Sequence, residues 1–239
     1  MIDLTAALAA TWPALRQIDV PGFTLREGAG GGSRVSAATA LEGWRAEDIA
    51  GAEAGMRDLG QRPLFMVREG EAALDAQLEA RGYVIADPTV LRAASIDVLD
   101  DREIPRVTVF TIWEPLAIMT EIWSAGGIGP ARLAVMARAQ DPKTAIFGRI
   151  KDQPAGTAFA AVHDGTVFVH AVEVLPRLRR NGLAAWMMRQ AARWGRGHGA
   201  SQVAILVTRA NEGANALYAS LGMAEVGGYH YRKHPEEPS

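Results

Sequence analysis

The hydrophobic positions in the second half of the chain predict a regular series of strands and helices. Short apolar runs predict strands, and the pair Asp164-Gly165 predicts a hairpin turn; the runs span 106–113, 144–150, 156–162, 166–174 and 201–208. Apolar residues at helical spacing predict helices after Pro115, over 131–139, from Leu183 and after Asn211. The order is strand, two helices, three strands, helix, strand, helix, strand, which is a mixed α/β arrangement.

The stretch from Val172 to Ala184 combines an apolar strand, a basic turn and the start of an amphipathic helix. The free N–H groups and the positive dipole end of a helix N-terminus attract anions. Arg177, Arg179 and Arg180 add positive charge, and Gly182 has no Cβ to block the approach of a phosphate. The sequence therefore predicts a diphosphate site. The alternative is that Arg177 and Arg179 are solvated surface charges without a ligand.

The helix that follows is predicted to pack one apolar side against the sheet and to expose its other side to solvent. Leu183, Met187 and Trp194 share one side of it, and Arg189, Arg193 and Arg196 are expected to lie outside.

Two motifs in this region resemble one known family. Arg179-x-x-Gly182-x-Ala184 resembles the signature with which GNAT acyltransferases cradle the pyrophosphate of acetyl-coenzyme A. One helix and one strand later, Asn211-x-x-Ala214-x-x-Leu217-Tyr218-x-x-x-Gly222-Met223 resembles the family's second block, with Met223 in place of the usual Phe. The resemblance implies the GNAT acyl-CoA N-acyltransferase fold, with acetyl-CoA as co-substrate and no metal. Transferred to this sequence, it implies contacts to the cofactor from Val172, Val174, Arg177, Arg179, Arg180, Asn181, Gly182, Leu183, Ala184, Asn211, Asn215 and Tyr218.

The same resemblance names two candidates for proton transfer. Tyr218 matches the tyrosine that stands near the thiol and can protonate the leaving thiolate, and its alternative role is packing against the sheet. Glu173 is a carboxylate in an apolar strand and is the candidate general base, unless it emerges past the sheet and stays solvated. His170 is expected on the other face of a regular strand, as a core residue, and a bulge would change those faces. Asn211 also suits the N-cap of its helix.

Composition limits the classes of protein that the chain can be. It has 239 residues, 49% hydrophobic and 22% charged, which is typical of an ordinary globular protein. A net charge of −2 does not favour nucleic acid or an acidic membrane surface as a partner. The absence of cysteine excludes disulfides, thiolate metal sites and a cysteine nucleophile. No apolar run approaches the length of a membrane span, and the first residues lack a basic segment, so we expect a cytoplasmic protein.

An internal repeat connects the two halves of the chain. Gly82 aligns with Gly222 at an offset of 140 residues, which pairs Val67 with Val207 and Arg92 with Arg232. An acidic helix over 44–60 stands where the basic turn would be, and acids repel a diphosphate. We therefore predict a degenerate GNAT-like domain at 1–98 and a catalytic GNAT domain at 99–239, with the charged segment 99–103 as linker. An unrelated α+β domain is the alternative for the first part.

The predicted function is acetyl transfer from acetyl-CoA to a primary amine of a small molecule, by direct attack in a ternary complex. A non-catalytic acyl-CoA-binding sensor or scaffold is the alternative. Nucleotide-binding glycine motifs are absent from the basic turn, which argues against a nucleotide site. No motif in the sequence identifies the amine acceptor. The sequence is also compatible with a homodimer.

Overall fold

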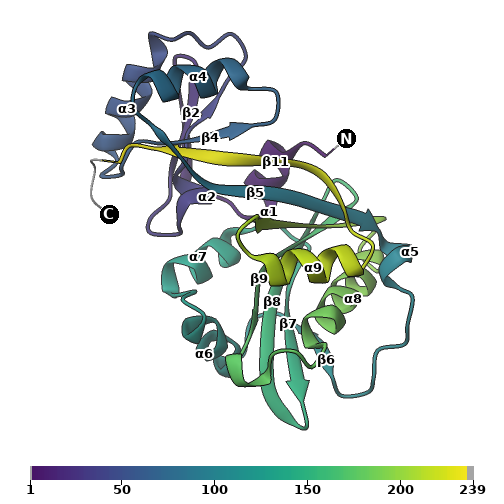
Figure 1. Ribbon diagram of the computed structural model, residues 1–239. Helices are drawn as coiled ribbons and strands as arrows, with labels where there is room; N and C mark the ends of the chain where they lie inside the picture. The colour runs from purple at the N-terminus through teal and green to yellow at the C-terminus, as the bar shows by residue number, and fades with distance from the viewer. Residues whose placement is uncertain (1, 236–239) are drawn as a thin grey trace. The chain divides into compact units, whose positions relative to one another are not determined.

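The computed structural model describes residues 2–235, and its contacts divide the chain into two compact units. Of the described residues, unit 1 takes 2–12, 91–207 and 211–226, and unit 2 takes 13–90, 208–210 and 227–235. The long strands β5 (Val84–Ser95) and β11 (Ala224–Lys233) contribute residues to both units (Figure 1).

Unit 1 contains the predicted series of elements in the predicted order, ending with the first residues of the last strand. They are β6 (Val109–Ile112), α6 (Ala117–Ala125), α7 (Pro130–Arg138), β7 (Lys143–Ile150), β8 (Gln153–His163), β9 (Thr166–Val174), a 3-10 turn η1 (Pro176–Leu178), α8 (Leu183–Arg196), β10 (Gln202–Thr208), α9 (Glu212–Ser220) and β11. The short helices α1 (Leu4–Thr11) and α5 (Ile96–Leu99) also belong to this unit. β6 begins later than predicted, because Val107 takes a left-handed conformation with φ +62°.

The strands of unit 1 run in the order β10-β9-β8-β7-β6. β9 pairs in parallel with β10, and the other neighbouring strands are antiparallel. Gly195 of α8 packs closely against Val167, whereas Trp12, which follows α1, packs against Phe159 and His170. Val167 and His170 are three positions apart on β9, and successive residues of a strand point to opposite faces. α8 and α1 therefore cover opposite faces of the sheet.

Unit 2 contains a three-stranded antiparallel sheet of β1 (Arg16–Val20), β2 (Phe23–Glu27) and β3 (Thr39–Ala40). The helices α2 (Ser33–Ser36), α3 (Asp48–Asp58) and α4 (Ala72–Ala80) and the strand β4 (Leu64–Arg68) complete it (Figure 1). β4 is bridged in parallel through Phe65 to Ala38 and pairs antiparallel with β11. The hydrophobic core of unit 2 includes Phe23, Phe65 and Leu78.

The structure reproduces the internal repeat at the level of elements and hydrogen bonds. An offset of 140 residues carries α4 exactly onto α9, and the strands before and after each helix correspond. Each helix ends at a glycine with positive φ, +86° at Gly82 and +76° at Gly222. The residue after each glycine donates to the same helical position, Tyr83 to Leu78 at 3.0 Å and Met223 to Tyr218 at 3.1 Å. The repeat is therefore a structural feature.

The two units do not divide at residue 98, where the sequence placed its boundary. α1 is packed into unit 1, where Gln140 donates its N–H to the carbonyl of Ala10 at 2.9 Å, and residues 227–235 belong to unit 2. The compact units are thus not consecutive halves of the sequence. That the first part is a degenerate GNAT domain stays a prediction.

Candidate functional site

The N-terminus of α8 has the features of the predicted anion site. Arg180 and Gly182 both take left-handed conformations, with φ +66° and +76°, and turn the chain from η1 into the helix. No side chain caps α8, so its first N–H groups remain for a ligand. A Cβ added to Gly182 would meet no atom within 4 Å, so this glycine faces open space.

Close packing and ion pairs fix the position of α8. Its first residue, Leu183, lies against Gly148 and Gly156, where any Cβ would come within 3.1 Å of the leucine side chain. On the other side, Arg189 donates to both oxygens of Asp101 at 2.7 and 2.9 Å. The expectation that Arg189 lies outside is wrong: the residue is only 8% exposed, because the charged segment after α5 folds over it.

A β-bulge near the end of β9 determines which way Glu173 points. Thr157 pairs with Glu173 but Phe159 pairs with His170, so β9 carries one extra residue, and Ala171 takes φ +51°. His170 and Glu173 therefore share a face, contrary to the expectation for a regular strand. The bulge that the sequence could not reveal is the reason.

His170 is nevertheless a core residue, as expected. It is 3% exposed, its Nε2 lies 3.0 Å from the hydroxyl of Thr11, and its ring centroid lies 4.9 Å from that of Trp12. The Thr11 hydroxyl itself donates to the carbonyl of Ala7 at 2.8 Å, so it accepts from the histidine. α1 thus covers His170.

Glu173 is paired with a residue of the basic turn. Its side chain is 16% exposed, and its Oε1 accepts from Arg179 Nη2 at 3.0 Å. Arg179 also donates through Nε to the carbonyl of Val174 at 3.0 Å. The Arg179 guanidinium is therefore bound to the end of β9, while its neighbour Arg180 makes no such contact among the described residues.

The helix α9 (Glu212–Ser220) places Asn211, its N-cap, and Tyr218 on the same face of the helix. Asn211 caps the helix, because its Oδ1 accepts from the N–H of Ala214 at 3.1 Å. Tyr218 is 4% exposed, and burial raises the pKa of its phenol well above the ordinary value. Within residues 2–235 its hydroxyl has no hydrogen-bond partner. It stays protonated at neutral pH.

These elements enclose a cavity of about 650 Å³, a size typical of small-ligand sites. Ten of the residues proposed from the sequence line it: Val172, Glu173, Val174, Arg179, Arg180, Gly182, Leu183, Ala184, Asn211 and Tyr218. Three proposed residues do not. Arg177 is exposed and Asn181 donates to the carbonyls of Leu178 and Arg179, whereas the amide of Asn215 is engaged by Arg92.

The sequence prediction omitted seven lining residues. They are Leu178, Ala185, Gly213, Ala214, Ala216, Leu217 and Ser220. Ala214 and Leu217 belong to the second motif, and Ala214 lies three residues after Asn211 and four before Tyr218, so a signal was present.

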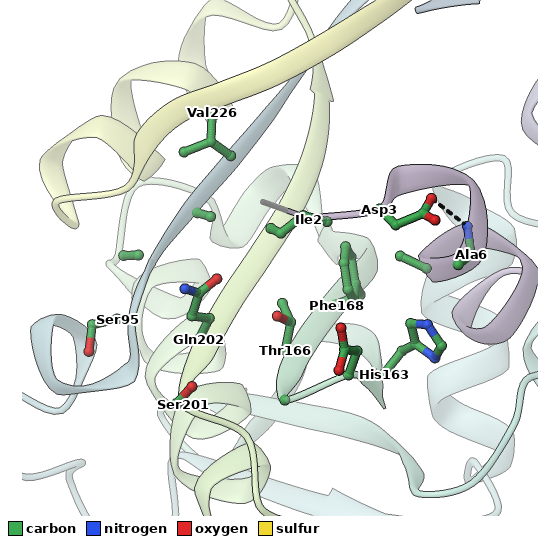
Figure 2. A pocket seen from close by; sticks show the side chains of 15 residues that line it. Ile2, Asp3, Ala6, Ser95, His163, Thr166, Phe168, Ser201, Gln202 and Val226 are labelled. Carbon is green, nitrogen blue, oxygen red and sulfur yellow. Dashed lines mark hydrogen bonds between the residues drawn. The ribbon is translucent and has the colours of Figure 1, made fainter.

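A second cavity of about 600 Å³ lies at the opposite end of β9 (Figure 2). Phe168 and Thr166 form one side of it, and Asp3, whose carboxylate accepts from the N–H of Ala6 at 3.1 Å, lies at another. None of its lining residues is Arg or Lys, and Asp164 adds a second carboxylate. It does not suit a diphosphate.

Comparison with known proteins identifies the class of the domain that holds the first cavity. Residues 113–223 match the model of the Acetyltransferase (GNAT) family. This segment is therefore a GNAT acetyltransferase domain, and the resemblance found in the sequence is confirmed. No curated protein matches the chain.

Solved structures with the same fold extend over most of the chain. A GCN5-related N-acetyltransferase from Kribbella flavida is 21% identical with a TM-score of 0.69, covering 98% of this chain and 94% of its own. A GNAT-family acetyltransferase structure from Novosphingobium aromaticivorans, described as putative, is 19% identical with a TM-score of 0.57, covering 90% and 89%. A tandem GNAT protein from the clavulanic acid biosynthesis pathway is 15% identical with a TM-score of 0.63, covering 91% and 78%. At these identities the likeness establishes the GNAT fold.

No helix within residues 2–235 is both long and apolar enough to cross a membrane. In the same part of the chain, no three His, Cys, Asp or Glu side chains are grouped as metal ligands.

Proposed function

We propose that the chain is an acetyl-CoA-dependent N-acetyltransferase that acts on a primary amine of a small molecule by direct attack in a ternary complex. The observation that carries this proposal is the 650 Å³ cavity, in which the uncapped start of α8, the bulged end of β9 and Tyr218 of α9 meet. The cavity offers partners for a diphosphate and for a thioester, and it contains two side chains that can transfer protons.

The residues of the cavity fit the parts of coenzyme A. The first N–H groups of α8 and the side chain of Arg180 would hold the diphosphate. The backbone of Val172 and Val174, next to the bulge, would bind the pantetheine arm, and Asn211 would meet it from the other side. When bound, the thioester supplies the electrophilic carbonyl.

Glu173 is the proposed general base. One of its oxygens is held by Arg179, and the other lies beside Gly126. Because the carboxylate is held in place and largely buried, it can take a proton from the amine nitrogen as that nitrogen attacks, directly or through one water.

Tyr218 is the proposed donor to the sulfur. A phenol whose pKa burial has raised is a weaker acid than an ordinary tyrosine. The same burial disfavours a free thiolate, so the phenol O–H can stabilise the sulfur by a hydrogen bond and transfer its proton as charge develops.

The Glu173–Arg179 ion pair favours one alternative function. If the pair holds the carboxylate away from the amine of the acceptor, the chain binds acyl-CoA without transferring the acyl group and would be a sensor or scaffold. The two functions differ in turnover and agree in binding.

The proposal assigns one cofactor site to the chain. In the first copy of the repeat, the helix that corresponds to α8 is α3, which begins with Asp48 after Glu47. The Asp48 carboxylate accepts from the N–H of Arg45 at 2.8 Å at this helix start. Negative charge there disfavours a diphosphate, which supports a degenerate first copy.

A panel of amines tests the function. Purified protein is mixed with acetyl-CoA and each amine, and free thiol and acetylated product are measured together. We expect at least one small amine to be acetylated with equal amounts of thiol released. Binding of acetyl-CoA without acetylation of any amine would support the sensor instead. We place the reaction in the cytoplasm, with no nucleic acid or membrane partner.

A further inference from the structure

Arg92 of β5 contacts α9 near both of its ends, although it lies outside the segment 113–223 that matches the family. Its Nε donates to Oδ1 of Asn215, in the first turn of α9, at 3.2 Å. Its Nη1 donates to the carbonyl of Met223, just beyond the helix, also at 3.2 Å. One guanidinium therefore braces the whole length of α9, and all of these residues belong to unit 1.

Each of these contacts continues to a residue of the cavity. Asn215 donates through Nδ2 to the carbonyl of Asn211 at 2.9 Å. Met223 donates its N–H to the carbonyl of Tyr218 at 3.1 Å. Arg92 is thus one residue removed from Asn211 and from Tyr218, both of which line the cavity.

The repeat provides the same contacts to α4, a helix whose residues do not line the 650 Å³ cavity. In unit 2, Arg232 stands 140 positions after Arg92 and donates to Asp75 at 2.6 Å and to the carbonyl of Tyr83 at 3.0 Å. Asp75 and Tyr83 are the counterparts of Asn215 and Met223. The helix that Arg232 braces, α4, carries Glu71 and Leu78 where α9 carries Asn211 and Tyr218.

We propose that Arg92, supplied by the first copy of the repeat, is a positioning residue for the acetyl-CoA cavity in the second copy. The role rests on the function proposed above. α9 has only nine residues, and helices of that length depend on tertiary contacts for their position. Since a displacement of about 1 Å is enough to impair a site, loss of the brace would misplace Asn211 and Tyr218.

Arg232 provides the matched control for a test of this role. Arg92→Ala and Arg232→Ala each remove one equivalent guanidinium, and Arg92→Lys and Arg232→Lys keep the charge while giving up the forked pair of contacts. The full chain is used throughout. Thermal unfolding is measured for each variant, and acetyl-CoA affinity is measured by calorimetry well below the unfolding midpoint.

We expect Arg92→Ala to raise the Kd for acetyl-CoA about tenfold or more, with a smaller rise for Arg92→Lys. Both Arg232 variants should keep the wild-type Kd to within about twofold, even where they lower the unfolding midpoint. If an alanine variant does not fold, the lysine pair decides. Equal Kd values for the Arg92 and Arg232 variants would overturn the positioning role and leave the proposed function standing. If the wild type and the Arg232 variants bind no acetyl-CoA, the proposed function fails, and the positioning role fails with it.

Discussion

Replacing Gly126 by alanine should move the carboxylate of Glu173 with little effect on the fold. Gly126 ends α6 with φ −89° and ψ 6°, a conformation that alanine adopts readily. A Cβ at this position would lie 2.5 Å from Cδ and Oε2 of Glu173. Ordinary contact begins at 3.4 Å, so the carboxylate must retreat by about 0.9 Å. The atoms that give way are the end of a side chain.

This displacement should affect catalysis far more than binding. A misplacement of about 1 Å at a reacting group costs up to about 10²-fold in rate, so we expect kcat/KM to fall by about that factor. The first N–H groups of α8 are not touched, and the Kd for acetyl-CoA should change by less than about threefold. Thiol release with an accepted amine gives kcat/KM, and calorimetry gives the Kd.

Gly129→Ala is the matched control. Gly129 lies three residues further along the same loop with φ −90°, and a Cβ there would meet nothing within 4 Å. Its kcat/KM should remain at the wild-type level. Wild-type turnover in Gly126→Ala, with the fold and affinity intact, would refute the assignment of Glu173 as the base.

Three further predictions concern other parts of the molecule. Tyr218→Phe should lower kcat by about 10²–10⁴-fold while acetyl-CoA affinity in calorimetry stays constant, and an undiminished kcat would remove Tyr218 from proton transfer. Gly182→Ala should cost about 1–2 kcal/mol in urea unfolding, because φ is +76°, and should also weaken acetyl-CoA binding; unchanged affinity would mean that the diphosphate binds elsewhere. Hydrogen bonds from Arg232 and His230 lower the pKa of Asp75, so its contribution to stability is complete above its ordinary value and lost as pH falls below about 4. Asp75→Asn should therefore lose about 1 kcal/mol at neutral pH and show a shallower acid decline, and a decline as steep as that of the wild type would contradict this.

The elements and the cavity of unit 1 were largely predictable from the sequence. β9 has exactly the predicted bounds, and α8 starts at Leu183 as the basic turn and glycine indicated. Local signals decide these features: apolar runs, a hairpin pair and a glycine at a helix start. The internal offset of 140 was equally visible, because the helix and its terminal glycine recur without a gap.

The features that the sequence did not reveal depend on contacts between distant residues or on a local backbone change. The bulge in β9 occurs at Ala171, and alanine carries no signal for a positive φ. Asn215 shares a helix face with Asn211, which made it a candidate cofactor ligand, but nothing local indicated its contact with Arg92, 123 residues away. Arg189 was expected to be solvated because its partner Asp101 is 88 residues away in the sequence.

The most direct test of the central claim is a calorimetric titration of the full chain with acetyl-CoA. The cavity of unit 1 offers the uncapped start of α8 to a diphosphate, whereas the corresponding helix in the first copy begins with Asp48. We therefore expect one molecule bound per chain, with binding weakened in Gly182→Ala. Two equivalent sites per chain would contradict the assignment of a single cavity, and no binding at all would contradict the proposed function.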